Sequence, residues 1–344
     1  NAKGHVSTTS SGADFNLRHK YSTVNGFSGT VTEQGLEKLM NDPDVKNIYL
    51  NREVHITLDQ SIPQIKANYT WPIQLNSTNI TGLDETICII DTGIDYNHTN
   101  LGDGWGNKVI GGYRSLNDKT DVQECDSNHS ACFDDNSHGT HVAGIIISND
   151  TTYRGVAPDA KLIAIKVMDS SGSGLYSDII AGIDWCVNNA SKFNISVISM
   201  SLGDKTEHNT YCNDDSTASS INSAVGAGII VTVAAGNCDW VGANCTNGIS
   251  SPACVENATP VGAVNDTDTI KYQRGNILNI LAPGISIYST IPGSWGFKTG
   301  TSMSTPHVAG AAALLKQFVR LYNGTDITPQ EIEDVLNATG TEID

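Results

Sequence analysis

The sequence predicts an α/β protein with a mostly parallel sheet and helices on both faces, preceded by a small α+β module. From Glu85 onward, short apolar segments alternate with longer helical segments for more than 200 residues. Segments such as TICIID at 86–91 are almost wholly apolar, as expected of a parallel strand buried on both faces. Strand–helix alternation implies right-handed crossovers, which place helices against the sheet.

The N-terminal part divides in two. We expect residues 1–19 to be a flexible segment, because positions 1–13 are rich in Ser, Thr and Gly. Residues 20–58 carry strand and helix patterns of their own. The expected elements are a strand at 22–31, a helix at 32–42, and strands at 45–51 and 52–58. Thr32 is placed to cap the helix, and Glu33 lies at its positive end.

Residues 59–344 form the main domain, which is irregular as far as residue 82. The expected strands are 86–91, 161–168, 197–203, 229–237, 258–264 and 278–284, and the expected helices are 138–148, 177–190, 216–228 and 304–322. Parallel sheets bind ligands at the carboxyl ends of their strands. Asp91 and Asn237 each follow an apolar segment, so both are expected at that edge.

Charge and hydropathy exclude several classes of function. Residues 1–58 are neutral, so the net charge of −17 falls entirely on 59–344. Such an acidic domain does not bind nucleic acid, which requires basic surfaces. No apolar segment reaches the roughly 18 residues of a membrane span. The chain starts at Asn1 without a basic-then-apolar leader, so we expect a signal peptide that has been removed, and a monomer.

Cysteines and glycosylation signals indicate a secreted protein. The eight cysteines are an even number, and Cys125/Cys132 and Cys238/Cys245 each bracket a short polar loop that a disulfide would close. Cys88 lies in an apolar strand, where a buried free thiol is an equal alternative. Thirteen N-x-S/T sites, some of them expected by chance, favour a glycoprotein.

Three motifs together indicate a serine protease. DTGID (91–95), HGTHVAG (138–144) and GTSMSTPHVAG (300–310) place an acid, a histidine and a serine in the order Asp, His, Ser. A serine hydroxyl needs a base to become nucleophilic, and that base needs an acid to orient it. We therefore predict Asp91, His138 and Ser302 as the catalytic group. Ser304 is a second nucleophile candidate, but Ser302 lies directly at the predicted turn.

A tetrahedral intermediate also requires donors for its oxyanion. Asn237 follows the apolar segment ending in VAAGN, and its side-chain amide is the predicted donor. A plain turn residue after Gly236 is the alternative interpretation. The backbone N–H of Ser302, at the start of a helix, is free to serve as a second donor.

These motifs, with SMSLG (199–203) and AAGN (234–237), resemble those of the subtilisin-like serine proteases over nearly the whole chain. Ser304 and Thr305 replace the usual Ala-Ser beside the nucleophile. The resemblance implies that Ser201, Leu202 and Gly203 form one substrate-binding edge, and that Gly172, Ser173 and Gly174 form the facing edge. An extended polypeptide substrate would pair with both edges. Plain loops are the alternative for each segment.

By the same resemblance, residues 20–58 are a ferredoxin-like propeptide that inhibits the enzyme and assists folding. Self-cleavage is expected between Leu58 and Asp59, with residues 55–58 left in the groove as a product-like plug. The chain would then be a zymogen inhibited by its own propeptide. An integral subdomain is the alternative interpretation of residues 20–58.

The resemblance implies that catalysis needs no cofactor. It also suggests a structural calcium ion, because many members of the family bind calcium. Gln60 matches a family ligand position, whereas Asn100 replaces the usual Asp and the loop at 149–155 is shorter than usual. The acid-rich insertion at 117–135 is either a second calcium site or a solvated charged loop. The chain ends before the family's usual final strand and helix.

Four other functions fit the sequence less well. An aspartic protease needs two DTG motifs, and this chain has one. A zincin carries HExxH, and Gly139 occupies the Glu position of HGTH. An inactive binding protein on a protease fold is disfavoured by the three intact triad positions. Ligation from the same acyl-enzyme is a variant that product analysis with an added amine would reveal.

Overall fold

The structure, a computed structural model, describes residues 2–8, 14–20, 26–50, 58–238 and 247–343. The chain divides into two compact units, residues 1–55 and 56–344. Each unit is described by itself. The predicted strand at 52–58 lies outside the described residues, apart from Leu58.

The N-terminal unit is a four-stranded sheet in the order β2-β3-β1-β4 with one described helix. Its elements are β1 (Ala2–Thr8), β2 (Phe15–Lys20), β3 (Gly26–Val31), α1 (Glu33–Met40) and β4 (Val45–Leu50). β1 lies between β3 and β4, parallel to both, and β2 is antiparallel to β3. The α+β prediction is therefore confirmed, but the ferredoxin-like arrangement, which has two helices, is not.

The start of α1 follows the predicted cap. The Thr32 hydroxyl accepts a hydrogen bond from the Gly35 N–H at 3.1 Å, and the Lys38 ammonium pairs with Asp14. The Thr32 N–H donates to the Asp14 carbonyl, which ties α1 to the segment before β2.

The prediction of a flexible segment at residues 1–19 was wrong, because β1 and most of β2 fall within it. β1 pairs with a strand on each side. Backbone hydrogen bonds from two neighbours outweigh a side-chain composition that is typical of disorder.

The larger unit contains the predicted parallel sheet. The strand order is β14-β13-β12-β11-β7-β10-β8-β9, with β15 also paired to β13. The strands are β7 (Thr86–Asp91), β8 (Val109–Leu116), β9 (Asp121–Glu124), β10 (Lys161–Lys166), β11 (Ile195–Met200), β12 (Ile230–Ala234), β13 (Thr259–Val264), β14 (Ile270–Lys271) and β15 (Ile280–Pro283). Only β9 and β14, which pair at opposite ends of the sheet, are antiparallel to their partners.

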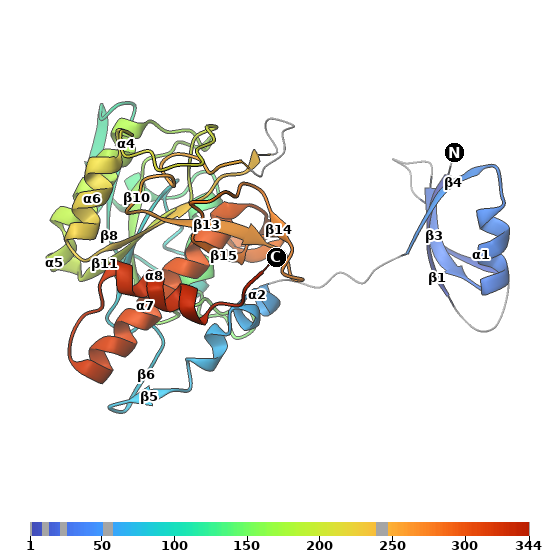
Figure 1. Ribbon diagram of the computed structural model, residues 1–344, viewed down its shortest axis with the longest axis horizontal. Helices are drawn as coiled ribbons and strands as arrows, with labels where there is room; N and C mark the ends of the chain where they lie inside the picture. The colour runs from blue at the N-terminus through green and yellow to red at the C-terminus, as the bar shows by residue number, and fades with distance from the viewer. Residues whose placement is uncertain (1, 9–13, 21–25, 51–57, 239–246, 344) are drawn as a thin grey trace. The chain divides into compact units, whose positions relative to one another are not determined.

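Helices cover both faces of this sheet and enclose two large apolar cores, with a smaller cluster at Val261, Ala282 and Val308. The helices are α2 (Leu58–Gln64), α3 (His138–Ile147), α4 (Tyr176–Asn188), α5 (Ala190–Phe193), α6 (Ala218–Gly226), α7 (Thr301–Asn323) and α8 (Pro329–Thr339). In β7, Ile87 and Ile89 join the core under α3 and α7, and Cys88 and Ile90 join the core under α4 and α6. Figure 1 shows α4 beside α6. The side-chain period of two thus buries both faces of β7.

The described residues of the unit also form two short hairpins and three 3₁₀ helices. They are β5 (Gln74–Leu75) with β6 (Thr78–Asn79), β16 (Ile287–Ile291) with β17 (Ser294–Lys298), and the 3₁₀ helices Ala67–Tyr69, Thr99–Leu101 and His129–Cys132. The expectation that residues 59–82 are irregular was wrong in part, because α2 forms there. Ser61 and Ile62 of α2 are buried in the body of the unit, which stabilises a turn of helix that the local sequence does not specify.

Three disulfides lie wholly within the described residues. Cys125–Cys132 closes the loop that was predicted, and Cys212–Cys254 joins two loops near the carboxyl edge of the sheet. Cys88–Cys186 ties β7 to α4, so the free-thiol alternative for Cys88 was wrong. Cys238 is also disulfide-bonded, but its predicted partner Cys245 lies outside the described residues. None of the described helices is long and apolar enough to span a membrane.

Candidate active site

A pocket of about 440 Å³ opens where the parallel strands end. β7 ends at Asp91, the loop after β11 begins at Ser201, and Asn237 lies three residues beyond β12. The predicted site residues that line this pocket are His138, Gly172, Ser201, Leu202, Gly203, Asn237 and Ser302. Ser173 and Gly174 lie in the same loop as Gly172 but do not line the pocket. The sheet therefore brings together residues spread over more than 160 positions.

The acid and the base are in direct contact. Nδ1 of His138 lies 2.8 and 2.9 Å from the two carboxylate oxygens of Asp91. Asp91 is fully buried, and the His138 side chain is 23% exposed toward the pocket. Burial lowers the pKa of His138, but the charge of Asp91 and the hydrogen bond to it outweigh that effect, so the pKa lies above the ordinary 6.5.

Asp134 holds the beginning of α3, where His138 is the first residue. It is almost fully buried. Its two carboxylate oxygens accept hydrogen bonds from the N–H groups of Asn136, Ser137 and Thr140 and from the hydroxyls of Thr92 and Thr140. The residue directly before the helix, Ser137, has a φ of 94° and makes no side-chain cap. Asp134 therefore supplies the negative charge that the helix N-terminus favours.

Sequence reasoning missed this role of Asp134, although the acid lies only four residues before His138. The signal was weak, because Ser137 occupies the usual cap position and Asp135 is an equally close acid. Asp135 instead pairs with the buried ammonium of Lys166 at 2.7 Å.

Gly139 permits the close approach of α3 to the end of β7. A Cβ atom at this position would lie 2.1 Å from the carbonyl oxygen of Gly93. The Gly139 N–H donates to the Thr92 hydroxyl at 2.9 Å. Any larger residue would push His138 away from Asp91.

Ser302 is the second residue of α7. Its hydroxyl donates to the carbonyl oxygen of Ser201 at 3.1 Å, and the Ser201 hydroxyl donates to the carbonyl of Ser302 at 2.8 Å. The Ser302 hydroxyl makes no hydrogen bond to His138 in this arrangement, where both side chains are described. Catalytic hydrogen bonds are often unformed before substrate binds, and a rotation about one side-chain bond redirects this hydroxyl.

Ser304, the alternative nucleophile, is fully buried. It points into the packing of α7, where a Cβ atom on Gly284 would lie 2.2 Å from the Ser304 hydroxyl oxygen. No substrate carbonyl can reach a side chain in that position. The geometry therefore favours Ser302, which lines the pocket.

The side-chain amide oxygen of Asn237 bonds to Thr301, the residue before Ser302. Its Oδ1 accepts from the Thr301 N–H at 2.9 Å and from the Thr301 hydroxyl at 3.1 Å. The Thr301 hydroxyl in turn accepts from the Gly236 N–H. Among the described residues, no acceptor is bonded to the amide nitrogen of Asn237, which lines the pocket as an oxyanion donor requires.

The predicted calcium ligands lie on two separate elements, Gln60 on α2 and Asn100 on the 3₁₀ helix Thr99–Leu101. Gln60 is exposed on α2, and the Asn100 amide donates to Asn149 at 3.2 Å. Five of the six acids of the 117–135 insertion have separate partners. Asp121 pairs with Arg114, Glu124 accepts from Trp185, Asp126 pairs with Lys192, and Asp134 and Asp135 have the partners given above. This arrangement fits the charged-loop interpretation of the insertion better than a cation site.

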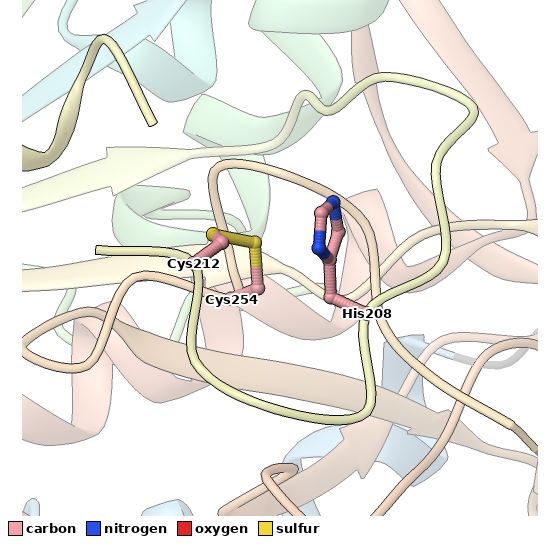
Figure 2. Close-up of side chains that lie close together, drawn as sticks. All are labelled: His208, Cys212 and Cys254. Carbon is pink, nitrogen blue, oxygen red and sulfur yellow. A yellow bond between two sulfur atoms is a disulfide. The ribbon is translucent and has the colours of Figure 1, made fainter. Parts of the chain in front are cut away.

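One group of potential metal ligands occurs in the part of the chain that the structure describes: His208, Cys212 and Cys254. Figure 2 shows the imidazole of His208 beside the Cys212–Cys254 disulfide. A cysteine binds metal as its thiolate, and here the two sulfurs are bonded to each other. The group is therefore a cross-link between the loops of His208 and Ser251 rather than a metal centre. These loops also pair through the backbone at His208 and Ile249.

Comparison with known proteins identifies the family. The chain matches the subtilase family over residues 82–342. This chain belongs to the subtilase family. Residues 3–57 match the family described as peptidase inhibitor I9. The subtilisin-like fold predicted from the motifs is thus confirmed, and the chain is a serine endopeptidase of that family with an inhibitor-type propeptide domain.

The curated relatives are bacterial subtilases. Subtilisin E of Bacillus subtilis (strain 168) is 37% identical over 94% of this chain and 78% of its own length. Subtilisin of Bacillus pumilus is 39% identical over 82% of this chain and 92% of its own length. A solved structure titled as a cold adapted subtilisin-like serine proteinase aligns with a TM-score of 0.59 and 30% identity, covering 79% of this chain and 88% of that one.

Proposed function

We propose that this chain is a secreted, self-processing zymogen that hydrolyses peptide bonds through Asp91, His138 and Ser302. The main support is the contact of His138 with both oxygens of the buried Asp91, at the rim of a pocket that Ser302 also lines. A buried carboxylate fixes the imidazole with Nδ1 protonated and Nε2 free to accept a proton.

In the proposed mechanism, Ser302 rotates away from Ser201 and gives its proton to Nε2 of His138 as it attacks the substrate carbonyl. Asp91 stabilises the imidazolium that forms. The amide of Asn237 and the N–H of Ser302 donate to the developing oxyanion. His138 then protonates the leaving amine, and water hydrolyses the acyl-enzyme by the reverse sequence. Subtilases need no cofactor for this chemistry.

The substrate is proposed to bind as an extended strand along residues 201–203 and against Gly172. Gly172 has a φ of 78°, and its loop is held by a hydrogen bond from the Asp169 N–H to the Ser173 carbonyl. The Asn136 amide donates to the Ser170 carbonyl at 3.0 Å, so this loop is fixed relative to the start of α3.

The N-terminal unit is proposed to act as the intramolecular inhibitor, with cleavage between Leu58 and Asp59. Residues 55–57 lie outside the described residues, and Leu58 is the first residue of α2. A protease binds an extended chain, so the first turn of α2 must unwind before this bond enters the pocket. The helix is anchored beyond that turn, because the Ser61 hydroxyl hydrogen-bonds Nε2 of the buried His307 at 3.0 Å.

The disulfides support an oxidising compartment, and exposed Asn79, Asn257 and Asn323 offer glycosylation sites. We propose a secreted glycoprotein, which an N-glycosidase would shift on a gel. A structural calcium at Gln60 and Asn100 stays a prediction. A chelator that lowers the melting temperature would support it.

Incubation at neutral pH followed by N-terminal sequencing tests this function. The wild type is expected to yield a fragment starting at Asp59, and Ser302→Ala is expected to stay intact. Active wild-type enzyme is then added to the intact Ser302→Ala chain. Cleavage in this mixture shows that the Leu58–Asp59 bond is accessible. Processing of Ser302→Ala alone would exclude Ser302 as the nucleophile.

A further inference from the structure

We propose that Lys298 makes this protease favour an acidic residue immediately after the bond that is cut. The proposal rests on the proposed function, because it assigns a specificity to the leaving-group side of the same pocket. The ligand chemistry is a side-chain carboxylate on the first residue of the leaving peptide.

Lys298 is fixed at the pocket by the β16–β17 hairpin. It is the last residue of β17, four positions before Ser302, and it lines the pocket beside Thr299. The hairpin is fastened to α3, because Nε2 of His141 lies 3.1 Å from the carbonyl oxygens of both Ile287 and Gly296. His141 is one turn of α3 beyond His138, so the same helix positions the base and the end of β17.

The charge of Lys298 is uncompensated. Its ammonium has no hydrogen bond or ion pair within the described residues, and the side chain is partly exposed. Lys166 is a contrast, since it is buried and bonds to Asp135 and to the carbonyls of Thr92 and Met168. The Lys298 charge is also among the influences that lower the pKa of His138, although the net effect there is upward. Lys298 and His138 line the same pocket, so the charge of Lys298 acts on the base.

The pocket is polarised along its length. Among its lining residues, the other fixed charge is Asp204, which follows the predicted substrate edge 201–203. Oδ1 of Asp204 accepts from the N–H and the hydroxyl of Thr206, which places this acid in the 201–206 loop. The negative charge thus belongs to the edge proposed to hold residues before the cut, and the positive charge belongs to a different element, the end of β17.

The direction of the reaction determines which residue meets Lys298. The acyl part of the substrate stays on Ser302, along residues 201–203. His138 must protonate the departing nitrogen, so the first residue of the leaving peptide lies on the side of His138. Lys298 is the cation on that side, and a carboxylate there would pair with it. The proposed self-cleavage, if it occurs there, would leave Asp59 as that residue.

The test uses three quenched fluorescent peptides with one sequence, Leu before the cut and Asp, Asn or Lys after it. The ratio of kcat/KM values within one enzyme is the readout, so loss of folded enzyme cancels. An exposed ion pair of 0.2–1 kcal/mol predicts an Asp preference over Asn of about 1.4- to 5-fold at low salt. The preference should shrink in about 1 M NaCl, where screening acts over ~3 Å.

Charge variants assign the effect to this residue. Lys298→Arg should keep the Asp preference, and Lys298→Glu should lose it and favour the Lys peptide. Lys271→Glu is the matched control, since it makes the same charge change at an exposed position of β14 outside the pocket. Its Asp preference should equal that of the wild type.

Equal rates for the Asp and Asn peptides in the wild type would overturn the proposal. So would an equal shift in Lys298→Glu and Lys271→Glu, which would reveal only the net field of the protein. Failure of the proposed function gives a different pattern, in which no peptide is cleaved or Ser302→Ala cleaves all three. A second readout is self-processing, where Asp59→Lys should slow the cut and Lys298→Glu should restore it.

Discussion

The two halves of the candidate triad differ in how completely the fold assembles them. Asp91 and His138 are in contact, and Thr92 and Asp134 tie the end of β7 to the start of α3. Ser302 lies in the first turn of α7, where its hydroxyl donates to Ser201 and not to His138. The contact between Asp91 and His138 is therefore already formed in the fold, whereas the hydroxyl of Ser302 is engaged with Ser201.

This difference has a physical origin. Asp91 is a buried charge and needs hydrogen bonds to be stable, so its surroundings are closely specified. A serine hydroxyl is neutral and at the pocket can bond to the nearest carbonyl at little cost. Substrate binding along residues 201–203 would occupy the Ser201 carbonyl and release Ser302, which couples nucleophile activation to substrate.

The largest effect is expected from removing the nucleophile. Ser302→Ala should reduce kcat to the residual level of about 10³–10⁴ over the uncatalysed reaction that binding and oxyanion donors provide. Ser304→Ala is the matched control. Its hydroxyl is buried and has no hydrogen-bond partner among the described residues, so its removal should leave kcat unchanged and the melting temperature equal or higher. A kcat of Ser302→Ala equal to that of the wild type would contradict the assignment of Ser302 as the nucleophile.

Breaking the fixed half should be nearly as severe. Asp91→Asn keeps the size of the side chain but removes its charge, so His138 loses its correct tautomer, and kcat should fall about 10⁴-fold. Kinetics above pH 8 and a crystal structure of the variant would check that the fold is intact. Activity within tenfold of wild type would show that Asp91 does not orient the base.

The pH profile sharpens the same comparison. His138 must be neutral to accept a proton, and Asp91 raises its pKa, so activity should fall as the pH drops through a value above 6.5. Asp91→Asn should move this inflection to lower pH. The Asp91–His138 interaction stabilises the fold fully below the unfolded pKa of His138, and that contribution is lost as pH rises through the folded pKa. An inflection unmoved in the variant would contradict the account.

Loss of the oxyanion donor should have an intermediate effect. Asn237→Leu removes the amide, and kcat should fall by about 10²- to 10³-fold, the range that such a loss gives in subtilisin itself. Thr301→Val removes one of the two hydrogen bonds to Asn237 but keeps the amide, so its kcat should change far less. Comparable losses in both variants would mean that Asn237 acts through the backbone of α7 and not as a donor.

The smallest effect concerns the anchor of α2. Burial lowers the pKa of His307 to about 4, so the imidazole is neutral and accepts from Ser61 at neutral pH. Ser61→Ala should lower the free energy of unfolding by about 1–3 kcal/mol at pH 7, as measured by urea titration. Because unfolded histidine binds its proton near pH 6.5, stability from His307 should decline as pH falls from about 6.5 to about 4. If Ser61→Ala is as stable as the wild type, the hydrogen bond between Ser61 and His307 does not contribute to the free energy of unfolding.

Much of the site was predictable because its chemistry lies in short motifs. Asp91, His138 and Ser302 each come with small residues that the close packing requires, as Gly139 shows against Gly93. The apolar strands were predictable because burial on both faces leaves a plain signal, of which β7 is the clearest.

The rest depends on contacts that are distant in sequence. Asp134 and Asp135 are indistinguishable locally, and only the packing of Thr92 and Lys166 gives them different partners. β1 is a strand because β3 and β4 flank it, and α2 is a helix because Ser61 and Ile62 find buried partners in the larger unit. Lys298 belongs to no motif, and only the fastening of β17 to α3 brings it to the pocket.

Covalent labelling tests the central claim most directly. A fluorophosphonate reacts with a serine only where a base activates it, so the processed enzyme should carry one label, mapped by peptide mass to Ser302. His138→Ala should abolish the label while the fold remains intact by circular dichroism. A label on Ser304 would contradict the assignment of Asp91, His138 and Ser302. So would an enzyme that cleaves peptides but does not react with an excess of the reagent.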